Sequence, residues 1–182
     1  IVVGTMIDYE ISRRLCVLRF NRPPLNTIDQ ALLGALREAI ARAENDSAAD
    51  ALVLIGSAEH FSAGADIHIF ETIHSEAEAR ALSQEFQQAF GRIEECSKPV
   101  VAGLAGRVMG GALELALACH LRVAARDAQL SLPEVRLGIL PGAGGTQRLP
   151  RIIGPAKALE AMLTGRPIGA AEAQRLGLVD AV

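Results

Sequence analysis

Short apolar runs alternate along the chain with longer stretches in which apolar residues recur every three or four positions. The helical spacing is clearest over residues 27–44, where Thr27 or Asp29 is placed to cap an amphipathic helix. The same spacing predicts a second long helix over residues 75–96. These two helices are the longest elements that the hydrophobic pattern predicts.

The other predicted elements are shorter and are bounded by glycine, proline or polar residues. Runs rich in apolar and β-branched residues predict strands at residues 6–11, 15–20, 51–55, 100–105, 121–124 and 129–132. Helices are predicted at residues 110–118, 146–153, 155–164 and 170–176, with a glycine loop at 139–145. Strands that alternate with helices indicate an α/β fold with largely buried sheets. No linker, low-complexity segment or repeat of residue identities divides the chain, so we expect one domain over residues 1–182.

Residues 100–119 are nearly all apolar, and a stretch of about 20 such residues is long enough to span a bilayer. Arg107 and Glu114 interrupt the stretch, which also holds four glycines. Ionisable groups in the middle of a membrane span cost several kcal/mol, so this pattern favours a buried strand, a glycine turn and a buried helix.

Composition narrows the class of protein further. With 182 residues, half of them apolar, and a net charge of −3, the chain is globular and offers no bulk attraction to nucleic acid or an anionic membrane. Cys16, Cys96 and Cys119 are widely spaced and form no CxxC motif, which predicts buried thiols in a reducing, cytoplasmic setting. The four histidines show no metal-binding spacing, so no metal site is expected.

Two carboxylates stand among apolar residues. Glu114 follows a glycine pair that opens a helix, where free backbone N–H groups can stabilise a developing oxyanion. A carboxylate among apolar neighbours is either paired or raised in pKa, and a structural ion pair with Arg107 or Arg122 is the alternative reading. Glu134 follows a proline. The alternative reading of Glu134 is a structural one, in which its carboxylate interacts favourably with the dipole at the first turn of a helix.

Two glycine-rich turns accompany these carboxylates. The first, HFSAGADI at residues 60–67, can offer N–H groups to a carbonyl oxygen, although an ordinary tight turn explains it equally. The second, at residues 139–145, lacks the last glycine of GxGxxG and any following GK[ST], so it does not indicate nucleotide binding. Two carboxylates beside such turns suit general acid–base catalysis next to an oxyanion site, without naming a substrate.

Four segments, in order and at matching spacing, resemble the crotonase superfamily, the enoyl-CoA hydratases and isomerases. They are FSAGADI at residues 61–67, KPV through GGALELA at 98–116, LPE through PGAGGTQRL at 132–149, and TG through GLV at 164–179. The resemblance covers almost the whole chain. It implies the crotonase-like ββα superhelix, an α/β fold.

The resemblance also implies site residues. The backbone N–H groups of Ala65 and Gly111 match the family's oxyanion hole, and Glu114 and Glu134 match its catalytic carboxylates. In hydratases of the family both glutamates hold the attacking water: the one matching Glu114 helps activate it for attack at the β-carbon, and the other exchanges the α-proton. Positions matching substrate-binding residues are Leu25, Ala63, Asp66, Ile67, Gly110, Pro133 and Gly142. No cofactor is implied, since CoA is part of the acyl-CoA thioester substrate.

Because both glutamates are present, the resemblance favours an enoyl-CoA hydratase of fatty acid β-oxidation. The alternatives are a Δ3,Δ2-enoyl-CoA isomerase, which generally needs only the carboxylate matching Glu134, and the hydratase part of a bifunctional protein with 3-hydroxyacyl-CoA dehydrogenase. An RNA-binding relative is disfavoured by the acidic balance. Family members continue past the GLV segment with a helical segment that closes the acyl pocket, so trimer-based homo-oligomers are expected where it is present; the chain here stops at Val182.

Overall fold

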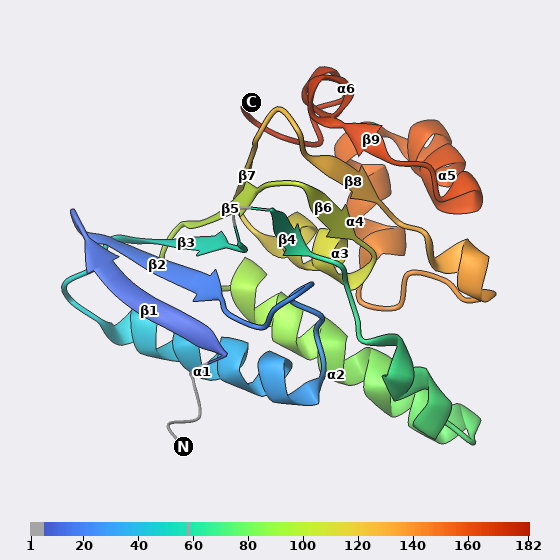
Figure 1. The fold of residues 1–182 in the computed structure, drawn as a ribbon, viewed down its shortest axis with the longest axis horizontal. Coiled ribbons are helices and arrows are strands. Elements are labelled where there is room, and N and C mark those ends of the chain that lie inside the picture. The colour runs from blue at the N-terminus through green and yellow to red at the C-terminus, as the bar shows by residue number, and fades with distance from the viewer. Residues whose placement is uncertain (1–5, 58) are drawn as a thin grey trace.

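The computed structural model describes residues 6–57 and 59–182, which form two β-sheets with helices packed around them (Figure 1). The first sheet has five strands in the order β1-β2-β3-β5-β7. Its first two strands pair antiparallel and the others run parallel. These strands are β1 (Ile7–Ser12), β2 (Leu15–Phe20), β3 (Ala51–Ile55), β5 (Val100–Leu104) and β7 (Leu121–Ala124).

The second sheet has four short strands in the order β4-β6-β8-β9. Its first three strands are parallel, and the last pairs antiparallel with β8. The strands are β4 (His60–Ser62), β6 (Arg107–Met109), β8 (Gln129–Ser131) and β9 (Ile168–Gly169). This small sheet lies at the centre of the molecule in Figure 1.

The helices lie on both sides of this centre. In Figure 1, α1 and α2 run side by side below the five-stranded sheet, whereas α5 and α6 lie together at the opposite end of the molecule. Two 3₁₀ turns, η1 (Ile67–Thr72) and η2 (Glu134–Leu137), follow strands of the small sheet. The α-helices are α1 (Gln30–Asn45), α2 (Glu76–Glu94), α3 (Gly111–Ala118), α4 (Gly145–Ile153), α5 (Pro155–Thr164) and α6 (Ala170–Arg175).

A structural repeat organises the middle of the chain. Three times in succession the chain passes through a strand of the large sheet, a strand of the small sheet and a helix: β3-β4-α2, β5-β6-α3 and β7-β8-α4. This ββα repeat confirms the predicted α/β superhelix. The repeat shares topology rather than residue identities, so it is not visible in the sequence alone.

The core lies between the sheets and the helices. Alternate residues of β2 and β3 point inward and are fully buried, as the strand periodicity requires. Phe20 of the large sheet meets Phe61 of the small sheet edge to face, with ring centroids 5.4 Å apart, and so joins the two sheets. Fully burying one such aromatic side chain stabilises the fold by roughly 2–3 kcal/mol.

Every residue of α3 is buried, which confirms that residues 100–119 form interior strands and a helix. No helix in the described part of the chain is long and apolar enough to cross a membrane. The three cysteines are free and buried, as predicted.

The boundaries differ from the prediction where local hydrogen bonds override periodicity. The first long helix begins at Gln30 because the Asp29 carboxylate caps it, accepting a hydrogen bond from the Leu32 N–H at 2.9 Å. Thr27 is therefore not the cap, and Ile28 instead pairs with Ala65 as an isolated bridge. Strands β4, β6 and β9 were not predicted, since two or three residues are too few for a hydrophobic period.

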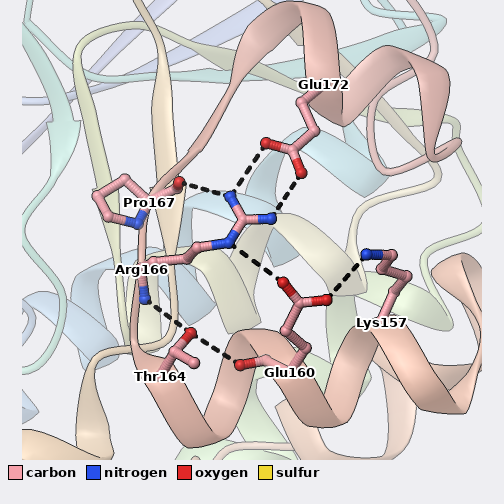
Figure 2. Close-up of polar contacts among 6 residues, drawn as sticks. All are labelled: Lys157, Glu160, Thr164, Arg166, Pro167 and Glu172. Carbon is pink, nitrogen blue, oxygen red and sulfur yellow. Dashed lines mark hydrogen bonds and ion pairs between the residues drawn. The ribbon is translucent and has the colours of Figure 1, made fainter.

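The C-terminal helices are linked by a charged network centred on Arg166 (Figure 2). Its guanidinium pairs with both carboxylate oxygens of Glu172 at the start of α6, at 3.1 and 2.7 Å, and with Glu160 of α5 at 3.5 Å. Lys157 donates to the same Glu160 at 2.8 Å. The side chains of Arg166, Glu160 and Glu172 are partly exposed, so the network orients α6 on α5 and adds little to stability.

Candidate active site

The candidate site lies where three strands of the small sheet end. Because β4, β6 and β8 are parallel neighbours, their carboxyl ends meet at one edge of the sheet. The segments that follow these ends are residues 63–66, 110–111 and 132–134. The fold thereby brings together the two predicted oxyanion donors and Glu134, although they are far apart in sequence.

The segment after β4 is fixed by backbone hydrogen bonds to residues 25–28. The Ala63 N–H donates to the Leu25 carbonyl at 2.9 Å, and the Ile28 N–H donates to the Gly64 carbonyl at 2.8 Å. The Asp66 N–H donates to the Ile28 carbonyl at 2.9 Å. These bonds use the N–H groups of Ala63 and Asp66 and the carbonyl of Gly64, but not the N–H of Ala65.

The N–H groups of Ala65 and Gly111 lie next to each other. A Cβ placed on Gly111 would stand 3.4 Å from the Ala65 nitrogen, and one on Gly64 would stand 3.3 Å from the Gly111 nitrogen. Within residues 6–57 and 59–182, no acceptor takes a hydrogen bond from either N–H. Two adjacent donors without an acceptor among these residues, one of them at the N-terminus of α3, are suited to stabilise a developing negative charge.

Glu114 lies one turn into α3, is 3% exposed, and is held by the glycine loop before α4. Its Oε1 accepts hydrogen bonds from the N–H groups of Ala143 at 2.8 Å and Gly145 at 2.7 Å. Burial raises the pKa of the Glu114 carboxyl, while these two N–H donors and then the Arg148 charge oppose the rise. Neither Arg107 nor Arg122 pairs with it: Arg122 binds the carbonyls of Leu178 and Cys119 instead. The ion-pair alternative is therefore wrong.

Glu134 lies at the start of η2 and is 8% exposed. A Cβ on Gly110 would stand 3.1 Å from its Oε1, so a glycine at that position makes room for the carboxylate beside the start of α3. Its Oε2 is buried and has no hydrogen-bond partner among the described residues. Burial and, to a smaller extent, the charge of Glu114 raise the pKa of Glu134 from 4.5 to about 7, against a lowering by its own backbone N–H.

The two carboxylates therefore share one site. Gly110 lies between the two residues, because a Cβ on it would meet the Glu134 carboxylate and its carbonyl accepts the backbone N–H of Glu114 at 3.0 Å. The charge of Glu114 also contributes to the raised pKa of Glu134. Like charges in a buried site disfavour double ionisation, which favours a state with one carboxylate and one carboxylic acid. One carboxylate and one carboxylic acid side by side can accept and donate a proton in the same reaction.

The raised pKa of Glu134 predicts a pH-dependent stability. A carboxyl whose pKa is higher in the folded than in the unfolded state destabilises the fold as the pH rises from 4.5 through about 7. The Glu134→Gln variant cannot ionise, so we expect its free energy of unfolding at pH 8 to exceed the wild-type value by on the order of 2 kcal/mol. At pH 4 the two proteins should be equally stable. Urea unfolding at both pH values measures this, and equal stability at pH 8 would contradict it.

The structure spreads the other expected substrate-binding residues around this site. The hydrogen bond from the Ala63 N–H to the Leu25 carbonyl is one of those that fix the segment after β4, and the Asp66 side chain caps η1. Ile67 is exposed, and Pro133 leads directly into Glu134. The Gly142 carbonyl points away from Glu114 and accepts hydrogen bonds from α2, so the loop meets Glu114 through Ala143 and Gly145 instead.

The sequence analysis did not predict the N–H groups of Ala143 and Gly145 as partners of Glu114. The signal that could have indicated them is a buried carboxylate that needs donors, together with a glycine-rich segment able to supply free N–H groups. No group of three or more metal-ligating side chains that could hold an ion occurs in the described residues.

A model of the family described as enoyl-CoA hydratase/isomerase matches residues 10–182. The chain belongs to this family. It is also similar to solved structures of family members: the crystal structure of an enoyl-CoA hydratase from Thermoplasma volcanium GSS1 aligns with a TM-score of 0.93 and 34% identity, over 98% of this chain and 72% of that one. The predicted resemblance and the crotonase fold are thereby confirmed.

Particular relatives are similar in sequence over almost all of this chain. A probable enoyl-CoA hydratase of Bacillus subtilis (strain 168) is 43% identical over 173 residues, which are 95% of this chain and 67% of the relative. The peroxisomal bifunctional enzyme of Pongo abelii is 43% identical over 178 residues, which are 97% of this chain and 24% of the relative. The chain thus spans two thirds of the first relative and about a quarter of the second.

Proposed function

We propose that the protein is an enoyl-CoA hydratase, which adds water across the 2,3 double bond of enoyl-CoA thioesters in fatty acid β-oxidation. The observation that carries this proposal is the pair of buried carboxylates, Glu114 and Glu134, beside the free N–H groups of Ala65 and Gly111. The relatives named as enoyl-CoA hydratases support the same reaction.

In the proposed reaction the N–H groups of Ala65 and Gly111 bind the thioester carbonyl oxygen. They stabilise the negative charge that forms there when a nucleophile attacks the β-carbon. Removing one such donor typically costs roughly 3 kcal/mol of transition-state stabilisation. The Gly111 N–H lies at the N-terminus of α3, so the helix dipole adds to this stabilisation.

The carboxylates divide the proton transfers. Ionised Glu114 takes a proton from water as the water oxygen bonds to the β-carbon, and protonated Glu134 gives its proton to the α-carbon. The pair still holds one proton afterwards, now on Glu114, and its return to Glu134 restores the starting state. The reverse reaction, dehydration, starts with the proton on Glu114 and with Glu134 ionised.

The position of Glu114 separates hydration from isomerisation. A double-bond migration moves one proton within the substrate and can be served by one carboxylate, whereas hydration needs a second group to activate water. Two N–H donors to Oε1 orient the Glu114 carboxylate and favour its ionised form. This arrangement supports a base that is poised to activate water.

A second candidate is the same reaction within a longer protein. Multifunctional β-oxidation proteins are 41–43% identical to this chain, as similar as the single hydratase. We propose that the chain serves as the hydratase part of such a protein where a dehydrogenase segment adjoins it. We also propose that it assembles as a trimer-based homo-oligomer where the family's C-terminal helical segment is present.

The proposed function is tested by mixing the protein with crotonyl-CoA and following the loss of the conjugated thioester absorbance. We expect conversion to 3-hydroxybutyryl-CoA, identified by mass spectrometry with one oxygen from labelled water. A longer 2-enoyl-CoA and a 3-enoyl-CoA are assayed in parallel. Migration of the 3-enoyl double bond without any water addition would contradict hydration and support the isomerase.

A further inference from the structure

Helix α2 holds the outer side of the loop that contacts Glu114. The Gly142 carbonyl accepts two hydrogen bonds from this helix, from Ser83 Oγ at 2.6 Å and from Gln87 Nε2 at 2.7 Å. The next residue, Ala143, turns its N–H to the opposite side and donates to Glu114. One short segment is therefore bonded to α2 on one side and to the buried carboxylate on the other.

Arg148 makes a third connection between the same loop and α2. Its guanidinium donates to the Ala143 carbonyl at 3.1 Å and, from Nε and Nη2, to Glu94 of α2 at 3.2 and 2.8 Å. A Cβ on Gly144, whose φ is +113°, would stand 2.1 Å from Arg148 Nη1. The guanidinium thus lies close against the loop at Gly144, where a glycine leaves room for it.

The geometry points to a positioning role for α2: Ser83 and Gln87, with Glu94 acting through Arg148, fix the loop whose N–H groups hold Glu114 Oε1. This inference rests on the proposed function, because it assigns to these residues the orientation of the proposed water-activating base. The three anchors lie on the outer face of the loop and touch neither carboxylate, so they act through Ala143 and Gly145. Orientation errors of about 1 Å at a reacting group can lower a rate as much as 10²-fold.

The charged groups around Glu114 come from three elements. Arg148 of α4 favours its ionised form, Glu134 of η2 opposes it, and Glu94 of α2 reaches it only through the ion pair with Arg148. If the hydrogen bonds from α2 to the loop are removed, the N–H groups of Ala143 and Gly145 are no longer held in line with Glu114, while the charges around Glu114 are unchanged. The pKa of Glu114 should then rise, and hydration should require a higher pH.

The test is the Ser83→Ala/Gln87→Leu double variant, which removes both donors to the Gly142 carbonyl. Its matched control is Gln84→Ala/Gln88→Leu, since these neighbouring side chains of α2 are exposed and make no hydrogen bond within the described residues. We expect kcat for crotonyl-CoA hydration to fall about tenfold in the double variant, with KM changed less than about twofold. The acidic limb of its pH profile should move up by about half a unit.

A second variant, Glu94→Gln, should also lower kcat, because it weakens the hold on Arg148. If the double variant and its control behave alike, or if only the melting temperature changes, α2 is a structural neighbour and the inference is overturned while hydration stands. If the wild-type protein does not hydrate enoyl-CoA, the proposed function fails. A ¹³C titration of the Glu114 carboxyl then decides the inference: a higher pKa in the double variant supports it, and an unchanged pKa overturns it.

Discussion

The Glu114→Gln variant should hydrate crotonyl-CoA about 10³-fold more slowly than the wild-type protein, because an amide cannot take a proton from the attacking water. The substitution keeps the shape of the side chain and an oxygen for the Ala143 and Gly145 N–H groups. Substrate affinity should therefore stay within a few-fold of the wild-type value. Steady-state kinetics with crotonyl-CoA, together with the melting temperature, measure these effects.

The Glu134→Gln variant separates the proposed function from its alternative. For a hydratase it should lose water addition as completely as Glu114→Gln does, since both proton transfers are needed. An isomerase would behave differently: Glu114→Gln would leave the migration of a 3-enoyl double bond intact, and Glu134→Gln would abolish it. Unchanged hydration in both glutamine variants would remove the basis of the assignment.

The second large effect is expected for Gly64→Ala. Gly64 has φ +95°, and a Cβ there would stand 2.4 Å from the Met109 carbonyl oxygen, which is backbone and cannot rotate away. The added methyl group should push the turn that carries Ala65 away from the start of α3, separating the two N–H donors. We expect kcat/KM to fall by about 10²–10³-fold, the loss typical of a missing oxyanion donor. The strained backbone should also lower the free energy of unfolding by about 1–3 kcal/mol.

The matched control for this change is Gly34→Ala. Gly34 lies in α1, and an added Cβ meets no atom within 4 Å. Alanine is the better helix former, so this variant should be as active as wild type and more stable by up to about 1 kcal/mol. Equal activity of the Gly64→Ala and Gly34→Ala variants would show that the donor pair does not contribute to catalysis.

Much of the fold was predictable because its long elements have a clear hydrophobic period. The two longest helices were predicted from their apolar spacing, and the buried run that contains β5 and α3 from its apolar composition and its glycines. Of the small sheet only β8 was predicted, because the strands are two or three residues long and their pairing joins segments distant in sequence. Since this sheet places Ala65, Gly111 and Glu134 side by side, the proximity of these residues could be expected only from the family resemblance.

The interactions around Glu114 show a second limit of sequence reasoning. Its apolar neighbours predicted a raised pKa, but two nearby arginines offered an equally good structural explanation. The actual partners are backbone N–H groups of a loop about 30 residues further along, and the only mark that such donors leave in the sequence is the glycine-rich composition of the loop. The anchors on α2 are ordinary polar residues of an amphipathic helix, where the pattern predicts only solvent exposure.

The measurement that tests the acid–base pair most directly is the pH dependence of kcat/KM for crotonyl-CoA hydration and for the reverse dehydration. If Glu114 and Glu134 share one catalytic proton, both directions should follow the same bell-shaped profile, because each needs the singly protonated pair. Activity should fall as the pH rises above about 7, where the buried Glu134 ionises. Such a pair is expected to titrate between about pH 5 and 9. A profile of kcat/KM that stays level over this range would contradict the account.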